Sequence, residues 1–153
     1  FLQPVFMTIA MATVSKSGAQ AKELGFAVES DKIVFNANEL LCVALREARG
    51  LAEAGYYPRL PPRGIKVAGR TGIANCLMML ANMKEGGMIS AHDYTVAKAA
   101  ATALCGGDIE TGSLVDEQWL LTVERKLFVE LLQNPKTQQR IQHMLETGKP
   151  LRN

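Results

Sequence analysis

The chain has 153 residues, of which 48% are apolar, and its 17 lysines and arginines against 15 acidic residues leave a net charge of +2. This composition is ordinary for a globular domain with one core and gives no sign of disorder. A charge so close to zero lacks the basic footprint that duplex binding requires, so we expect no nucleic-acid partner.

The first predicted element is a core helix over Phe1–Val14, with Pro4 in its first turn, where a missing N–H is harmless. An apolar run followed by small residues also fits a signal peptide, but the basic n-region is missing. The sequence has no initiator methionine, and we therefore expect it to belong to something larger.

Two further helices are predicted before residue 55. Ser17 is a good N-cap for a short helix that Gly25 ends. Lys32–Phe35 is short and β-branched, which suits one strand or an extended connection. Asn38 is then expected to cap an amphipathic helix that runs to Ala54.

A loop with three prolines follows over Tyr56–Ala68. Four cations lie in or just after it, beside the predicted start of the next helix: Arg59, Arg63, Lys66 and Arg70. Positive charge and free helix N–H groups together suit phosphate, such as the phosphates of CoA. The spacing matches no glycine-rich phosphate loop, so a solvated linker is the competing interpretation.

The stretch Thr71–Met83 is apolar on nearly every side, which is typical of a buried core helix. It is shorter than the roughly 20 apolar residues that a membrane span needs, so we expect no span here. Asn75 and Asn82 are seven residues apart and share one helical stripe. They either find backbone or water partners or line a polar site.

Capping signals divide the rest of the chain into three helices. A Ser-x-x-Asp pattern at Ser90 opens one that Gly106-Gly107 ends, and the same pattern at Ser113 opens another that runs to about Gln133. Asn134-Pro135 starts the last helix, which reaches Thr147 before Gly148. The whole pattern predicts a mostly α fold of about six helices with at most one short strand.

The titratable residues indicate no catalytic residue and no metal site. Cys42, Cys76 and Cys105 each lie among apolar neighbours, as buried thiols do, which favours a reducing, cytoplasmic location. His92 and His143 are expected on exposed helix surfaces. No nucleophile–base pair, carboxylate pair or dinucleotide loop can be placed.

Ser17–Asn36 resembles the stretch after the catalytic part of the crotonase (enoyl-CoA hydratase/isomerase) family, with Ala21, Glu23, Leu24 and Gly25 matching. The segments from Ile89 and Ser113 to Asn153 resemble the C-terminal end of bacterial bifunctional fatty-acid oxidation proteins. In those proteins a 3-hydroxyacyl-CoA dehydrogenase region precedes a crotonase-like region.

This resemblance implies a β-oxidation polypeptide that uses NAD and acyl-CoA, whose catalytic residues all lie upstream of Phe1. It implies the tail of a crotonase-like region over 1–55, a proline-rich linker over 56–68 and a C-terminal helical region over 69–153. We expect this non-catalytic segment to cover the core, to contact upstream domains of the same polypeptide and to take part in a homo-oligomer. The alternative is a stand-alone helical protein-interaction module.

Overall fold

The computed structural model describes residues 2–153, which form seven α-helices, one 3₁₀ helix and two short strands. The mostly α fold predicted from the sequence is confirmed. The chain divides into two compact units, one made of residues 1–12 and 61–153 and the other of residues 13–60.

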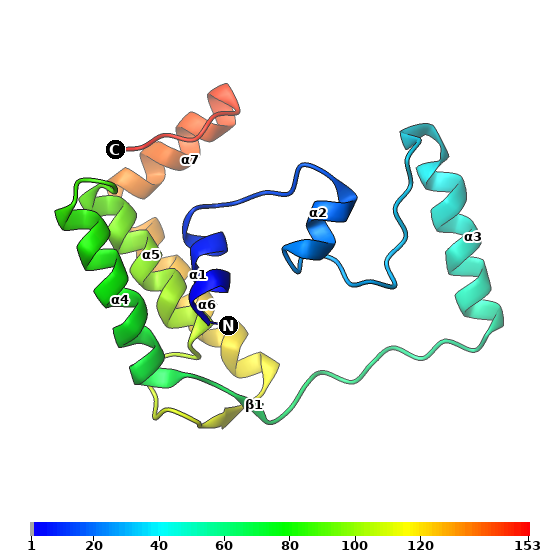
Figure 1. Ribbon diagram of the computed structural model, residues 1–153, viewed down its shortest axis with the longest axis horizontal. Coiled ribbons are helices and arrows are strands. Elements are labelled where there is room, and N and C mark those ends of the chain that lie inside the picture. Colours follow the sequence, from blue (N-terminus) through cyan, green and yellow to red (C-terminus); the bar gives the residue numbers. More distant parts are fainter. Residues whose placement is uncertain (1) are drawn as a thin grey trace. The chain divides into compact units, whose positions relative to one another are not determined.

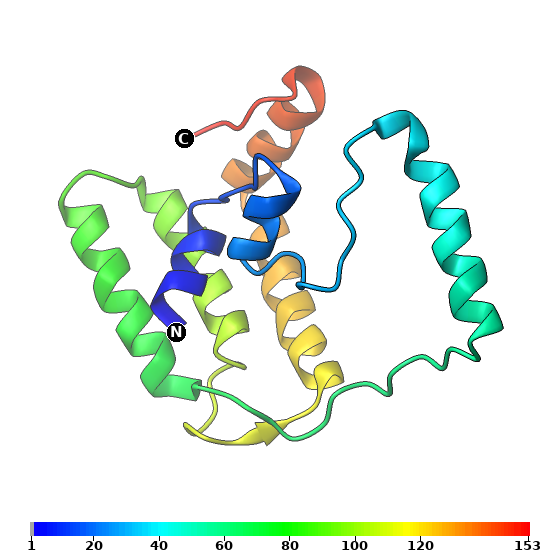
Figure 2. The same cartoon turned by 45° about the vertical axis from the view of Figure 1, so that its right-hand side comes forward.

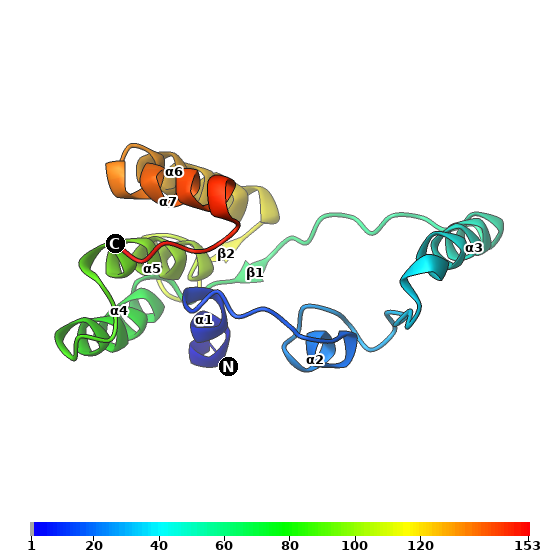
Figure 3. The ribbon, with the colours of Figure 1, turned by 90° about the horizontal axis from the view of Figure 1, so that it is seen from above.

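The first unit is built on α5 (Ala91–Leu104), which lies between α4 (Gly69–Glu85) and α6 (Glu117–Leu132) in Figures 1 and 3. The helices α1 (Leu2–Ala10) and α7 (Pro135–Thr147) pack at its sides, α1 on α5 and α4, and α7 on α6. The core consists of one aromatic side chain and smaller ones from three helices, namely Phe6, Cys76, Leu80, Ala97 and Ala101. Alanines at the contact let α4 and α5 approach closely.

A two-stranded antiparallel sheet joins distant parts of this unit. β1 (Ile65–Lys66) pairs with β2 (Leu114–Val115), with Ile65 opposite Val115. The pairing corrects two predictions, because residues 65–66 of the expected loop are a strand and Ser113 does not cap a helix. Asp116 is the N-cap of α6, and its side chain accepts a hydrogen bond from the backbone N–H of Trp119 at 2.8 Å.

The prediction that the Thr71–Met83 helix is buried all round is wrong. Its buried residues, spaced at three and four, are Gly69, Gly72, Cys76 and Leu80. Met78 is 62% exposed, and Asn75 and Asn82 also face solvent. The physical reason is that α1 and α5 cover one face of α4, whereas no described helix of the unit covers the other.

The second unit holds α2 (Gly18–Glu23), a 3₁₀ helix over Ala37–Glu39 and α3 (Leu40–Glu53). Ser17 caps α2 as predicted, and Lys32–Phe35 is an extended connection, visible between α2 and α3 in Figure 2. The predicted cap Asn38 is wrong: Asn36 accepts the N–H of Asn38 at the start of the 3₁₀ helix. None of residues 13–60, all of them described, is buried.

The other capping predictions are confirmed. Ser90 and Asp93 form a capping box at the start of α5, Asn134-Pro135 opens α7, and Gly148 ends α7 in the left-handed conformation with φ 67°. The predicted first helix appears as α1, ending four residues before Val14; Phe1 lies outside the described residues. No helix within residues 2–153 is long and apolar enough to cross a membrane.

We expect Leu80→Ala to lower the free energy of unfolding by about 2–5 kcal/mol, because Leu80 is only 1% exposed and its removal leaves a cavity between helices. Met78→Ala on the open face of α4 is the matched control, with an expected change within about 0.5 kcal/mol. Urea denaturation followed by the fluorescence of Trp119, the single tryptophan, measures both. Equal losses in the two variants would contradict the observed orientation of α4.

Candidate functional site

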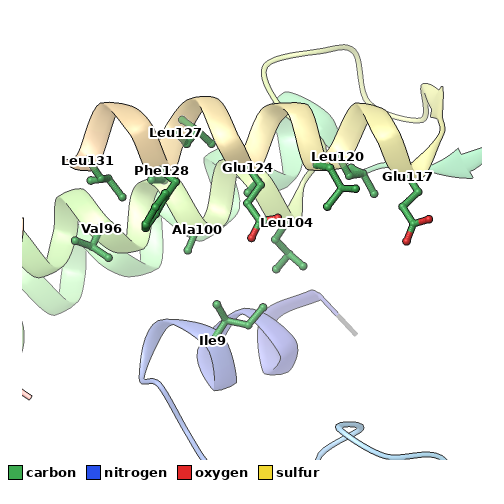
Figure 4. Close-up of a pocket in the computed structure, with 13 residues that line it drawn as sticks. Ile9, Val96, Ala100, Leu104, Glu117, Leu120, Glu124, Leu127, Phe128 and Leu131 are labelled. Atoms are coloured by element: carbon green, nitrogen blue, oxygen red, sulfur yellow. The ribbon is translucent and has the colours of Figure 1, made fainter. Parts of the chain in front are cut away.

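An apolar groove runs along α5 in the first unit, bounded by α1 and α6 (Figure 4). Its volume is about 510 Å³. The groove is lined by one residue of α1, five of α5 and seven of α6, namely Ile9, Val96, Ala99, Ala100, Ala103, Leu104, Glu117, Leu120, Leu121, Glu124, Leu127, Phe128 and Leu131.

The helical period explains why this groove forms. Three alanines of α5, Ala99, Ala100 and Ala103, make a low floor because their side chains end at Cβ. On α6 the lining positions 117, 121, 124, 128 and 131 are spaced alternately by four and three residues, so they form one stripe along the helix. The α6 stripe of longer side chains, with Ile9 of α1 on the other side, therefore stands above a floor of short ones.

The apolar walls are open to solvent. Ile9 is 46% exposed, Leu121 45% and Phe128 55%. Trp119, in the first turn of α6, is also 44% exposed. A contiguous exposed apolar surface of this kind is a candidate contact surface.

Two carboxylates, Glu117 and Glu124, are the only charged residues in the lining. Both belong to α6 and both are exposed. Neither forms an ion pair within 4.0 Å with any residue of 2–153. The α6 wall therefore carries negative charge that the described part of the chain does not neutralise.

A polar cluster lies near the Val96 end of the groove, away from Glu117. It adjoins a hollow of about 290 Å³ that shares Ile9, Val96 and Ala100 with the groove. Asp93 Oδ1 accepts from Arg140 at 2.8 Å and from Arg152 at 3.2 Å. Burial alone would raise the pKa of Asp93, but hydrogen bonds from Ser90 and Arg140 outweigh it and lower that pKa.

The same cluster fixes the end of the described chain. The Nε of Arg140 donates to Asn153 Oδ1 at 2.8 Å, and the Ser90 hydroxyl donates to the Asn153 carbonyl at 3.0 Å. Arg140 thus binds both the cap of α5 and the segment after α7. These contacts hold α5, α7 and residues 149–153 together.

His92 is buried, so the prediction of an exposed histidine is wrong there; His143 is half-buried. The His92 ring lies between α5 and α7, with Nε2 3.1 Å from Thr137 Oγ1. Burial lowers the pKa of His92, and the charges of Arg140 and Lys136 lower it further. The ring is therefore neutral at pH 7 and serves packing.

The four predicted phosphate-binding residues do not all belong to the same compact unit. Arg59 belongs to the second unit, whereas Arg63, Lys66 and Arg70 belong to the first. Arg63 lines an open hollow with Trp119, and Lys66 lies on β1. Arg70 donates from Nε to Asp108 at 2.7 Å.

The helix N–H groups invoked for phosphate binding are already paired. At the start of α4 the N–H of Gly69 donates to the Cys105 carbonyl at 2.9 Å and that of Arg70 to the Ile109 carbonyl at 3.0 Å. The N–H of Thr71 lies 3.4 Å from Thr111 Oγ1. Any phosphate held here would depend on side-chain charge, and its binding stays a prediction.

The cysteines divide into one exposed and two buried thiols. Cys42 is exposed on α3, which corrects the expectation for that residue, whereas Cys76 and Cys105 are fully buried. Burial raises the pKa of both buried thiols, that of Cys105 to about 11. Protonated, enclosed thiols are poor nucleophiles and metal ligands.

One comparison with known proteins finds a relative. The chain is 43% identical, over 148 residues and 97% of its length, to a protein of Bacillus subtilis (strain 168) described as a probable 3-hydroxyacyl-CoA dehydrogenase. The match covers 19% of that protein, so the chain spans about a fifth of the relative's length. No family model and no solved structure matches the chain.

We expect the stability of the first unit to fall between pH 7 and pH 5 through His92. The unfolded ring, with an ordinary pKa of about 6.5, binds a proton more readily than the folded one, so acid favours unfolding in the window below 6.5. His92→Gln removes this titration and should flatten the dependence of unfolding free energy on pH. Urea denaturation at pH 5, 6 and 7 tests this, and an unchanged slope in the variant would contradict it.

Proposed function

We propose that this chain is a non-catalytic helical segment of a larger, cytoplasmic fatty-acid β-oxidation protein that combines a 3-hydroxyacyl-CoA dehydrogenase with an enoyl-CoA hydratase-like region. The segment would cover the core of that region and build subunit contacts. The observation that carries the proposal is the 43% identity over nearly the whole chain to a dehydrogenase of which it spans about a fifth. The hydratase-like part rests on the resemblance of Ser17–Asn36 and of the segments from Ile89 and Ser113 alone.

The exposed apolar surface supports a structural role. No residue of 13–60 is buried, and on α3 Leu41 is 69% exposed and Leu45 62% exposed. In the first unit the apolar groove leaves large side chains open. Such surface is characteristic of a segment that packs against other protein.

The fold supports assigning the chemistry elsewhere in the longer polypeptide. NAD is held by a parallel βαβ unit, whereas the sheet in residues 2–153 is one antiparallel pair of two-residue strands. A thioester enolate needs aligned N–H donors and a general base. The described side chains of the groove offer two solvated carboxylates and apolar groups.

The central test is the mass of the natural polypeptide in cell extract, detected with an antibody against this chain. We expect a band several times 16.6 kDa, and we expect the purified 153 residues neither to hydrate crotonyl-CoA nor to oxidise a 3-hydroxyacyl-CoA with NAD. A band near 16.6 kDa would favour the stand-alone helical interaction module. Hydration by the isolated chain would refute the non-catalytic role.

We further propose that Arg59, Arg63, Lys66 and Arg70 contact the phosphates of CoA in the longer enzyme. Arg63→Glu should raise KM for acyl-CoA roughly tenfold, which corresponds to about 1.4 kcal/mol, and leave kcat unchanged. Lys149→Glu, an exposed charge reversal in the segment after α7, is the control and should keep the wild-type KM. An unchanged KM in the Arg63 variant would exclude the contact.

A further inference from the structure

We infer that the apolar groove seats an amphipathic helix from the part of the longer polypeptide outside these 153 residues, with its basic, N-terminal half beside Glu117 and Glu124. This inference rests on the proposed function and names the partner of one surface.

The shape fits a helix. The α6 wall runs from Glu117 to Leu131, which at about 1.5 Å per residue is a length of about 21 Å, or roughly four turns. The alternate spacing by four and three along that wall is the contact pattern that helices use to pack side by side. The alanine floor on α5 allows a third helix to approach closely.

The charge gives the helix a direction. Glu117 lies at one end of the groove and Val96 with Leu131 at the other (Figure 4). Beyond Val96 the adjoining hollow holds Arg140 and Arg152 against the single carboxylate of Asp93. A helix is positive at its N-terminus and negative at its C-terminus, so its favourable direction runs from the carboxylates toward the arginines.

The openness argues against an acyl chain as the occupant. Small ligands are usually enclosed over most of their surface, whereas Phe128, Leu121 and Ile9 are each about half exposed along this groove. An anionic lipid would also meet two carboxylates in the α6 wall. About four fifths of a polypeptide as long as the Bacillus relative lies outside the aligned stretch and is available to supply a helix.

The first test uses two synthetic 16-residue helical peptides with the same leucine stripe, one with lysines and the other with glutamates on the polar face of its N-terminal half. By calorimetry the lysine peptide should bind the 153-residue chain at least tenfold more tightly. The double variant Glu117→Lys, Glu124→Lys should reverse that preference, and Phe128→Asp should abolish binding. Met78→Asp, on the open face of α4, is the control and should leave binding unchanged.

The second test asks whether the longer polypeptide itself covers the groove. In a Cys42→Ser background, where the remaining thiols of residues 2–153 are buried, Phe128→Cys should react with a maleimide at least tenfold more slowly in the longer natural polypeptide than in the 153-residue chain, with the labelling of residue 128 itself followed by mass spectrometry after digestion. Circular dichroism confirms that each variant is folded.

Several outcomes would overturn the inference: equal binding of the two peptides, no binding, equal labelling rates, laurate binding that Phe128→Asp removes, or a dimer that the same variant makes monomeric. A long natural polypeptide combined with any of these leaves the proposed function standing and refutes the groove assignment alone. A natural polypeptide of 16.6 kDa would show that no longer polypeptide supplies the helix, whatever the result of the peptide binding.

Discussion

The close approach of α4 to the end of α5 is the constraint on which the rest of the first unit depends. A Cβ added at Gly72 would lie 2.9 Å from Cys105 Sγ, so only glycine allows this contact without movement. The approach brings the turn after α5 beneath the start of α4, where its carbonyls accept the N–H groups of Gly69 and Arg70. Gly106, at φ +86°, lies against the side chain of Val67 just before α4. This turn, held by those contacts, leads into β2 and so places α6 beside α5. The apolar groove lies along these two helices.

A second constraint holds the opposite end of the unit. The carboxylate of Asp93 accepts the N–H of Ser90 as part of the α5 cap and also binds Arg140 of α7 and Arg152. Removing one partner of an ion pair this enclosed leaves an uncompensated charge, which is far costlier than breaking an exposed pair such as Arg70–Asp108. Helix capping and docking of the terminal segment are therefore coupled through one side chain.

Local signals were predictable from the sequence, and long-range pairing was not. Ser17, Ser90 and Asn134 cap their helices because a cap needs only the next few backbone N–H groups. Ser113 shows the same Ser-x-x-Asp pattern as Ser90, yet its carbonyl accepts the N–H of Val67, 46 positions earlier in the chain. No feature near Ser113 announces that partner, so the start of α6 was placed too early.

The predictions of which residues are buried were wrong for the same reason. The apolar composition of α4 predicted burial on every side, but which face is covered depends on where α5 and α1 lie. His92 is predicted at the surface because no partner for it can be identified in the sequence, whereas Thr137 of α7 supplies one inside. The groove was missed as well, although the alternating spacing on α6 and the alanines of α5 were visible in the sequence. Reading them as one surface required knowing that the two helices are neighbours.

The second unit shows how far a sequence can specify helices without specifying a core. Ordering a residue costs about 1–2 kcal/mol of backbone entropy, and a helix of 14 residues such as α3 is marginal alone in water. Residues 13–60 bury no side chain that would offset this cost, and Phe35 is 98% exposed. Good caps and an amphipathic pattern can select the helical state only if something covers the apolar face. Residues 13–60 leave apolar surface open as the groove does, and under the proposed function the longer polypeptide would cover both.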